Sequence, residues 1–146
     1  MFNANIRIIA ANDANNTMPD TIIQKELSYR VCGLCFKAHN ALGRFRNEQT
    51  YADYLEGLFK DDGLEYVREQ PLPKSFTEEF ARRNIPDFVI EHKIVLDLKA
   101  KRLVDKDDYF QMRRYLAASN IKLGLIVNFR QEYLVPKRIL NSDMKE

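Results

Sequence analysis

The segment at residues 122–129 (KLGLIVNF) constrains the fold most, because it is an almost uninterrupted apolar run. Such a run is typical of a β-strand whose two faces are both covered, whereas a strand with one face in water alternates apolar and polar residues. A sheet that contains such a strand needs other elements packed on each side. The chain has 146 residues, of which 45% are hydrophobic, so a single domain can bury a core of this kind.

Helical spacing of apolar residues, and alternating or β-branched runs, predict the other elements. We expect helices over 22–42, 47–60 and 107–118, and strands within 64–69, 88–90, 94–100, 122–129 and 133–140. Asp20 or Thr21 is expected to cap the first helix, and Gly43 to end it. The order α-α-β-β-β-α-β-β predicts an α/β fold with a central mixed β-sheet flanked by helices.

Two segments lack a clear period. Residues 1–20 are rich in Asn and Ala, so we expect a flexible N-terminal arm with at most a short strand at 6–10. Residues 21–146 then form the single domain. Residues 74–84 are polar and charged, which predicts an irregular connection or a frayed edge strand.

Composition and charge bear on where the protein is found, but they do not identify its function. The net charge is +2 and the sequence pI about 8.5, which permits nucleic-acid binding without the strongly basic footprint of a dedicated binder. No apolar run approaches the ~20 residues that span a bilayer, and the N-terminus lacks a signal-peptide layout. Two cysteines cannot form a disulfide framework. We therefore expect a cytoplasmic protein with no membrane partner.

Two carboxylates and a lysine interrupt the apolar strands at 88–90 and 94–100. Residues two apart in a strand share a face, so Asp97 and Lys99 are neighbours, while Leu96 and Leu98 point to the other side. A buried carboxylate is costly unless it is paired or metal-bound. The simpler alternative is an ion pair between Asp97 and Lys99 on a solvated face.

The length of the turn after residue 90 decides where Asp87 lies. A three-residue loop at 91–93 pairs Ile90 with Ile94 and hence places Asp87 opposite Asp97, on the same face. A two-residue turn would place Asp87 opposite a leucine of the other face. Two facing carboxylates can hold a hard cation through oxygen ligands, which can polarise a phosphodiester and activate a bound water. A lysine two residues on can contact the phosphate or position the water.

These residues resemble a known family. Pro86-Asp87 followed by Asp97-x-Lys99 is similar to the signature of the PD-(D/E)XK nuclease superfamily. The further motifs are Glu26-Leu27-Ser28-Tyr29, His39-Asn40-Ala41-Leu42-Gly43, Glu48-x-x-Tyr51, Gln70-x-Pro-Leu-Pro, Gln111-x-x-x-Tyr115-Leu116 and LGLIVNF at 123–129. Together they resemble the small bacterial GxxExxY proteins over roughly residues 22–140.

The resemblance implies a restriction-endonuclease-like core and metal-dependent hydrolysis of nucleic acid, of DNA rather than RNA. It implies that Glu48, Asp87 and Asp97 hold Mg²⁺ or Mn²⁺, and that Lys99 is the catalytic lysine. Gln111, on the helix after the lysine strand, is implied to lie beside the active centre.

The chain departs from the family pattern at Phe45, where the GxxExxY motif has glycine. The segment 43–47 is therefore bulkier and more basic than in the family, which could narrow access to the site or add phosphate contacts through Arg44 and Arg46. Lys101 and Arg102 flank Lys99 and could line a phosphate track. The third signature position is Asp97, where the GxxExxY proteins more often have the longer glutamate.

Each candidate also has a simpler explanation. Glu48 could simply complement the dipole of its helix without binding a metal, and Gln111 could be a solvated helix residue. Cys32-x-x-Cys35-x-x-x-His39 superficially suggests zinc, but core cysteines and a histidine that bonds carbonyls near Gly43 explain it better. Tyr109 and Phe110 are expected in the core rather than as stacking residues.

Two other functions remain open at this stage. The first is a catalytically weak or inactive nucleic-acid-binding module with a nuclease fold, and the second is a structural or protein-interaction domain. Monomer and homodimer are both compatible with the sequence.

Overall fold

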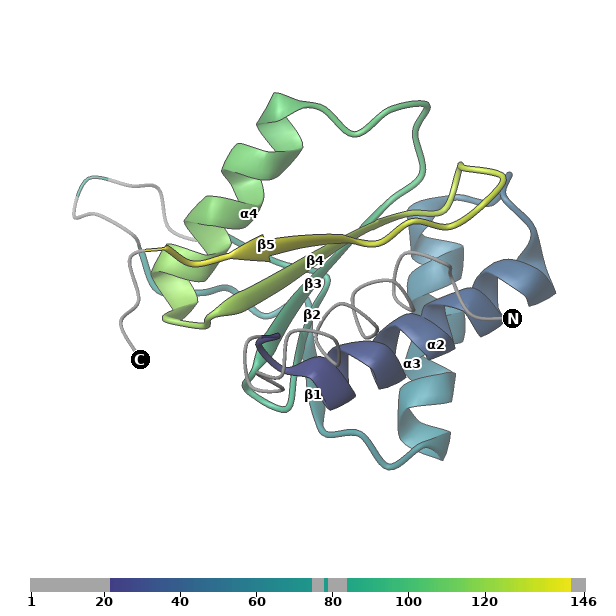
Figure 1. Cartoon of the computed structure of the whole chain (residues 1–146), viewed down its shortest axis with the longest axis horizontal. Coiled ribbons are helices and arrows are strands. Elements are labelled where there is room, and N and C mark those ends of the chain that lie inside the picture. Colours follow the sequence, from purple (N-terminus) through teal and green to yellow (C-terminus); the bar gives the residue numbers. More distant parts are fainter. Residues whose placement is uncertain (1–21, 75–77, 79–83, 143–146) are drawn as a thin grey trace.

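The computed structural model describes residues 22–74, 78 and 84–142. The expected arm at 1–20, its strand at 6–10 and most of the connection at 74–84 lie outside the described residues. The elements are α2 (Lys25–Leu42), α3 (Glu48–Asp61), β1 (Tyr66–Arg68), β2 (Phe88–Ile90), β3 (Ile94–Lys99), α4 (Lys106–Ser119), β4 (Leu123–Asn128) and β5 (Lys137–Leu140) (Figure 1). Their order matches the predicted order. None of the described helices is long and apolar enough to cross a membrane.

The five strands form one mixed sheet in the order β1-β2-β3-β4-β5. β3 and β4 pair in parallel, while the other neighbours pair antiparallel. A parallel pair needs a crossover, and α4 supplies it between β3 and β4. The α/β class and the mixed sheet are therefore as predicted, and the arrangement is consistent with a restriction-endonuclease-like core.

Helices cover both faces of the sheet (Figure 1). On one face α2 and α3 pack on residues such as Phe88, Leu96 and Leu98; on the other α4 packs on residues such as Val95 and Ile126. β4 is buried along its whole length, which confirms the strand covered on both sides. Because residues alternate in β3, Asp97 and Lys99 share the α4 face with Val95.

The helix boundaries follow capping chemistry at two of three starts. Asn47 caps α3 through a hydrogen bond to its Oδ1 from the Thr50 N–H (2.8 Å), and Asp105 caps α4 in a reciprocal capping box. For α2 the prediction was wrong: the helix starts at Lys25 after Gln24, which has φ 54° and no side-chain cap. Gly43 ends α2 as predicted, with its N–H bonded to the His39 carbonyl.

Gly124 in β4 allows α4 to lie close to the sheet. A Cβ at this position would overlap with Sδ of Met112 and lie 2.7 Å from its Cγ, and Met112 is 1% exposed. Gly124→Ala should therefore lower the free energy of unfolding by roughly 1–3 kcal/mol, the usual cost of overpacking. Urea denaturation would measure this cost.

A matched control and a second background test the cause. Gly57→Ala in α3, where no atom lies within 4 Å of an added Cβ, should be neutral or stabilising by up to ~1 kcal/mol. In a Met112→Ala background, Gly124→Ala should cost much less, because the clashing atoms are gone. An equal cost in both backgrounds would contradict the contact with Met112.

Candidate active site

The β2–β3 hairpin has the three-residue connection that brings the two acids together. Ile90 pairs with Ile94, and the register places Asp87 opposite Asp97, as predicted. Glu91 and His92 adopt φ values of 54° and 55°, left-handed conformations that suit a tight connection. The Glu91 carboxylate and backbone also bond to Glu65 before β1, so the turn is held from outside the hairpin.

Asp87 and Asp97 form a carboxyl pair on the α4 face of the sheet. Asp97 is 5% exposed, and Asp87 is half-buried. The Asp87 Oδ2 atom accepts a hydrogen bond from the Leu98 N–H at 2.6 Å. Burial, together with the charge of Asp97 and a hydrogen bond between the two carboxyl groups, raises the pKa of Asp87 to about 8. A nearby cation would favour the charged form and lower this pKa.

Lys99 joins this pair to α4. Its Nζ lies 2.8 Å from Asp97 Oδ2, 2.9 Å from Gln111 Oε1 and 3.8 Å from Asp108 Oδ1. Burial alone lowers the pKa of Lys99, but the carboxylates of Asp97 and Asp108 outweigh it, so the pKa is raised overall. Lys99 is thus a cation at neutral pH, suited to donate hydrogen bonds rather than to accept a proton.

Glu48 approaches this centre from the other helical layer. It lies in the exposed first turn of α3, yet its charge contributes to the raised pKa of both Asp87 and Lys99. Among the described residues, no three His, Cys, Asp or Glu side chains are gathered closely enough to hold a metal ion. The donor set that is present is the carboxyl pair. Mg²⁺ is commonly held by one or two carboxylates, with water and substrate phosphate as further ligands, so the pair fits such an ion.

Sequence reasoning missed Asp108, although its spacing from Asp105 is that of a capping box. The Asp108 carboxylate lies 2.5 Å from Lys101 Nζ and also bonds the Asp105 N–H at 2.9 Å. This contact raises the pKa of Lys101 and lowers that of Asp108, against the opposing effect of burial. Lys101 therefore ties α4 to the end of β3, whereas Arg102 is exposed.

The loops after β3 and β4 are bonded together. The Asn128 side chain accepts from the Lys101 N–H (3.1 Å) and donates to the Lys101 carbonyl (2.7 Å). The Phe129 N–H bonds to the Lys99 carbonyl at 2.8 Å. These bonds hold the carboxyl end of β3, where Lys99 lies, against the neighbouring strand.

Arg130 connects the same region to the loop between α2 and α3, and no sequence motif marks it. Its guanidinium donates to the carbonyls of Arg44 (2.7 Å) and Arg46 (3.2 Å). Arg44 lies over the ring of Phe45, with its Cζ 4.9 Å from the ring centroid. Arg44 and Arg46 thus lie in one anchored loop beside Glu48.

Three other predictions, for the two cysteines, His39 and Phe110, can be compared with the structure. Cys32 and Cys35 are buried core residues, and burial raises the pKa of Cys32 to about 12, as expected for inert thiols. His39 bonds the distant Gln131 carbonyl through Nε2 at 2.9 Å, instead of a carbonyl near Gly43. Phe110 was predicted in the core but is 52% exposed, because it lies on the outer side of α4.

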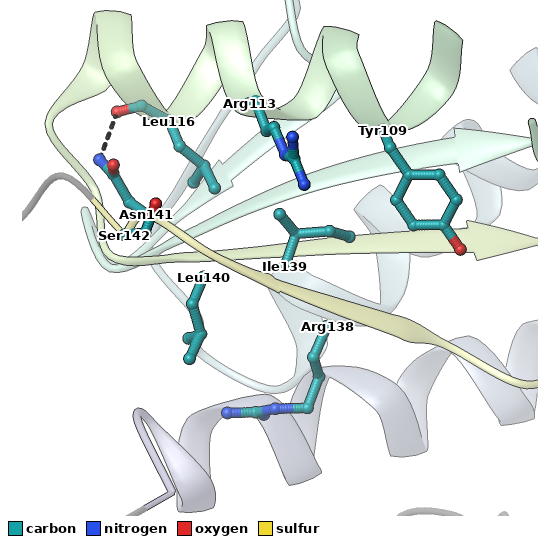
Figure 2. Close-up of a pocket in the computed structure, with 8 residues that line it drawn as sticks. All are labelled: Tyr109, Arg113, Leu116, Arg138, Ile139, Leu140, Asn141 and Ser142. Atoms are coloured by element: carbon teal, nitrogen blue, oxygen red, sulfur yellow. Dashed lines mark hydrogen bonds between the residues drawn. The ribbon is translucent and has the colours of Figure 1, made fainter. Parts of the chain in front are cut away.

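A separate groove of about 600 Å³ lies between α4 and the edge strand β5. Figure 2 shows Tyr109 and Arg113 entering it from α4, while Arg138 points away toward α2, where it bonds Ser28 and the Ile23 carbonyl. None of the residues predicted for the active site lines this groove.

Comparison with known proteins assigns the family. Residues 25–139, from the start of α2 into β5, match the family model of the PD-(D/E)XK nuclease superfamily. The chain belongs to this superfamily. Its members are generally metal-dependent nucleases and typically use divalent metals such as Mg²⁺. No curated protein and no solved structure matches the chain.

Proposed function

We propose that this member of the PD-(D/E)XK superfamily is an active, metal-dependent nuclease of the GxxExxY type that cleaves DNA in preference to RNA. The arrangement that supports it is the pair of buried Asp97 and half-buried Asp87, with the protonated Lys99 2.8 Å from Asp97. We also infer that residues 21–146 form one nuclease domain.

Each residue has a distinct part in this proposal. Asp87 and Asp97, with Glu48 at the edge, would hold Mg²⁺ or Mn²⁺, which when bound supplies a Lewis acid and an activated water. Lys99 would donate a hydrogen bond to the scissile phosphate and offset the charge that develops there. Gln111 would act as a positioning residue, because its Oε1 accepts from Lys99 Nζ. The buried surroundings strengthen these charge interactions.

Cleavage assays with labelled DNA and RNA in EDTA, Mg²⁺, Mn²⁺ and Ca²⁺ would test this function. We expect hydrolysis with Mg²⁺ or Mn²⁺, faster on DNA, and none in EDTA or with Asp97→Asn. Asp61→Asn, at an exposed acid at the end of α3, is the control that should cleave like the wild type. Metal-dependent binding of DNA without cleavage would favour the inactive binding module, and neither binding nor cleavage would favour an interaction domain.

A further inference from the structure

Phe45 is an exposed aromatic residue with two arginine side chains close to its ring. It lies in the loop between α2 and α3 and is 74% exposed, one of six large hydrophobic residues that are exposed in the described part of the chain. Arg44 Cζ lies 4.9 Å and Arg130 Cζ 5.8 Å from its ring centroid. An exposed aromatic ring with two guanidinium groups near it matches the two components of an unpaired nucleotide, a flat base and a phosphate.

The backbone around Phe45 is anchored, so its side chain is presented in a defined position. Before it, the Gly43 carbonyl accepts from the Tyr51 hydroxyl at 2.5 Å. On either side, the Arg130 guanidinium bonds the carbonyls of Arg44 and Arg46. Tyr51 is itself fully buried and stacks on Phe129, with ring centroids 4.2 Å apart. An ordered loop loses little further entropy when it binds a ligand.

The loop lies at the end of the sheet that carries the carboxyl pair. Phe45 precedes Glu48 by three positions, and the charge of Glu48 acts on Asp87 and Lys99. Arg130 directly follows Phe129, whose N–H bonds the Lys99 carbonyl. Figure 1 shows the loop between α2 and α3 beside the loop between β4 and β5 at this end. A base stacked on Phe45 would thus belong to a nucleotide near the scissile bond.

We propose that Phe45 is a stacking platform for an unpaired nucleobase, with Arg44 and Arg130 contacting the adjacent phosphates. This inference rests on the proposed nuclease function and specifies its substrate class: single-stranded nucleic acid, or duplex with a frayed end, flap or gap. Bases inside a continuous duplex are already stacked on one another and offer no free face to Phe45. Stacking on an aromatic side chain needs no particular base, so the preference is for structure rather than for sequence.

Binding assays without cleavage, in EDTA and in Ca²⁺, separate this inference from catalysis. The probes are an oligonucleotide carrying 2-aminopurine at successive positions, as a single strand and as a blunt duplex. The wild type should quench the 2-aminopurine fluorescence of the single strand but not that of the blunt duplex, whichever position carries the probe. Phe45→Ala should abolish the quenching and weaken single-strand binding by roughly 5- to 140-fold, the equivalent of one base stack. Duplex binding should change by less than about twofold, because no base stacks there.

The controls distinguish stacking from general apolar contact. Phe45→Tyr should retain quenching and affinity, whereas Phe45→Leu should lose quenching. Leu140→Ala removes an exposed apolar side chain from β5, at the opposite end of the sheet, and should behave like the wild type. Since Phe45 is exposed, thermal unfolding should be unchanged in its variants.

The outcomes for the two proposals are distinct. Quenching that depends on Phe45, in a protein that never cleaves, would support the stacking platform and overturn the nuclease function. Cleavage with equal binding by wild type and Phe45→Ala would support the nuclease and overturn the platform. Equal losses on single strand and duplex, full quenching by Phe45→Leu, or no nucleic-acid binding at all would also overturn the platform.

Discussion

Lys99→Met should lower the kcat of nucleic-acid cleavage by roughly 10²–10³-fold, the usual cost of removing one donor to a developing oxyanion. Lys99 is a half-buried cation beside the carboxyl pair, and the carboxylates of Asp97 and Asp108 keep it protonated. Single-turnover rates at saturating Mn²⁺ would measure the effect. Lys99→Arg should recover part of the rate, because it keeps the charge in a different geometry.

Metal affinity separates this role from a structural one. Lys99→Met removes a positive charge 2.8 Å from Asp97. Mn²⁺ should therefore bind more tightly, because the lysine no longer repels it, although cleavage slows. Lys101→Met is the matched control: Lys101 is tied to Asp108, and its loss should leave kcat within about tenfold, since it makes no contact with the carboxyl pair. Weaker metal binding in parallel with a lower melting temperature would instead mean that Lys99 only supports the fold.

Asp87→Asn should be more stable than the wild type in EDTA at pH 8, by roughly 1–3 kcal/mol, although it should not cleave. The asparagine Oδ1 can accept from the Leu98 N–H, as Asp87 Oδ2 does, and its amide can donate to Asp97. The substitution therefore keeps the hydrogen bonds and removes the like charge that burial penalises. Guanidinium denaturation of both proteins would measure the difference.

The pH dependence of this difference has a defined sign. The pKa of Asp87 is raised to about 8 in the folded protein, above the unfolded value near 4. The folded state then binds the extra proton, so the contribution of this group to stability is fully present below about pH 4 and is lost progressively as the pH rises toward 8. The advantage of Asp87→Asn should therefore grow from pH 5 to pH 8. An advantage independent of pH would contradict the raised pKa.

Divalent metal should narrow the difference in stability between the wild type and Asp87→Asn. At a hundredfold excess over its dissociation constant, an ion that binds only the native state stabilises it by about 2.7 kcal/mol. The wild type should gain this stability with Mn²⁺ at pH 8, and Asp87→Asn should gain little. Equal Mn²⁺ responses in the two proteins would show that the ion binds elsewhere in the chain.

Local sequence determined the elements of the sheet and the facing acids. The β-branched runs and the buried strand at 122–129 predicted β2, β3 and β4, because their side-chain patterns depend only on neighbouring residues. The three-residue turn at 91–93 was enough to place Asp87 opposite Asp97, since hairpin register follows from loop length. Strand alternation likewise placed Lys99 beside Asp97, and the family resemblance added Glu48 and Gln111 as candidates.

Contacts between distant segments were decided only by the tertiary structure. Helical periodicity could not show that Gln111 and Asp108 of α4 face Lys99, or that Phe110 faces solvent. Nor could the sequence show that Arg130, in the loop after β4, reaches the carbonyls of Arg44 and Arg46. Their side chains are directed by how the helices and loops pack on the sheet, and sequence spacing within one element carries no information on that packing. For the same reason, the raised pKa of Asp87 and the exposed position of Phe45 follow from burial and neighbouring charge, which exist only once the chain has folded.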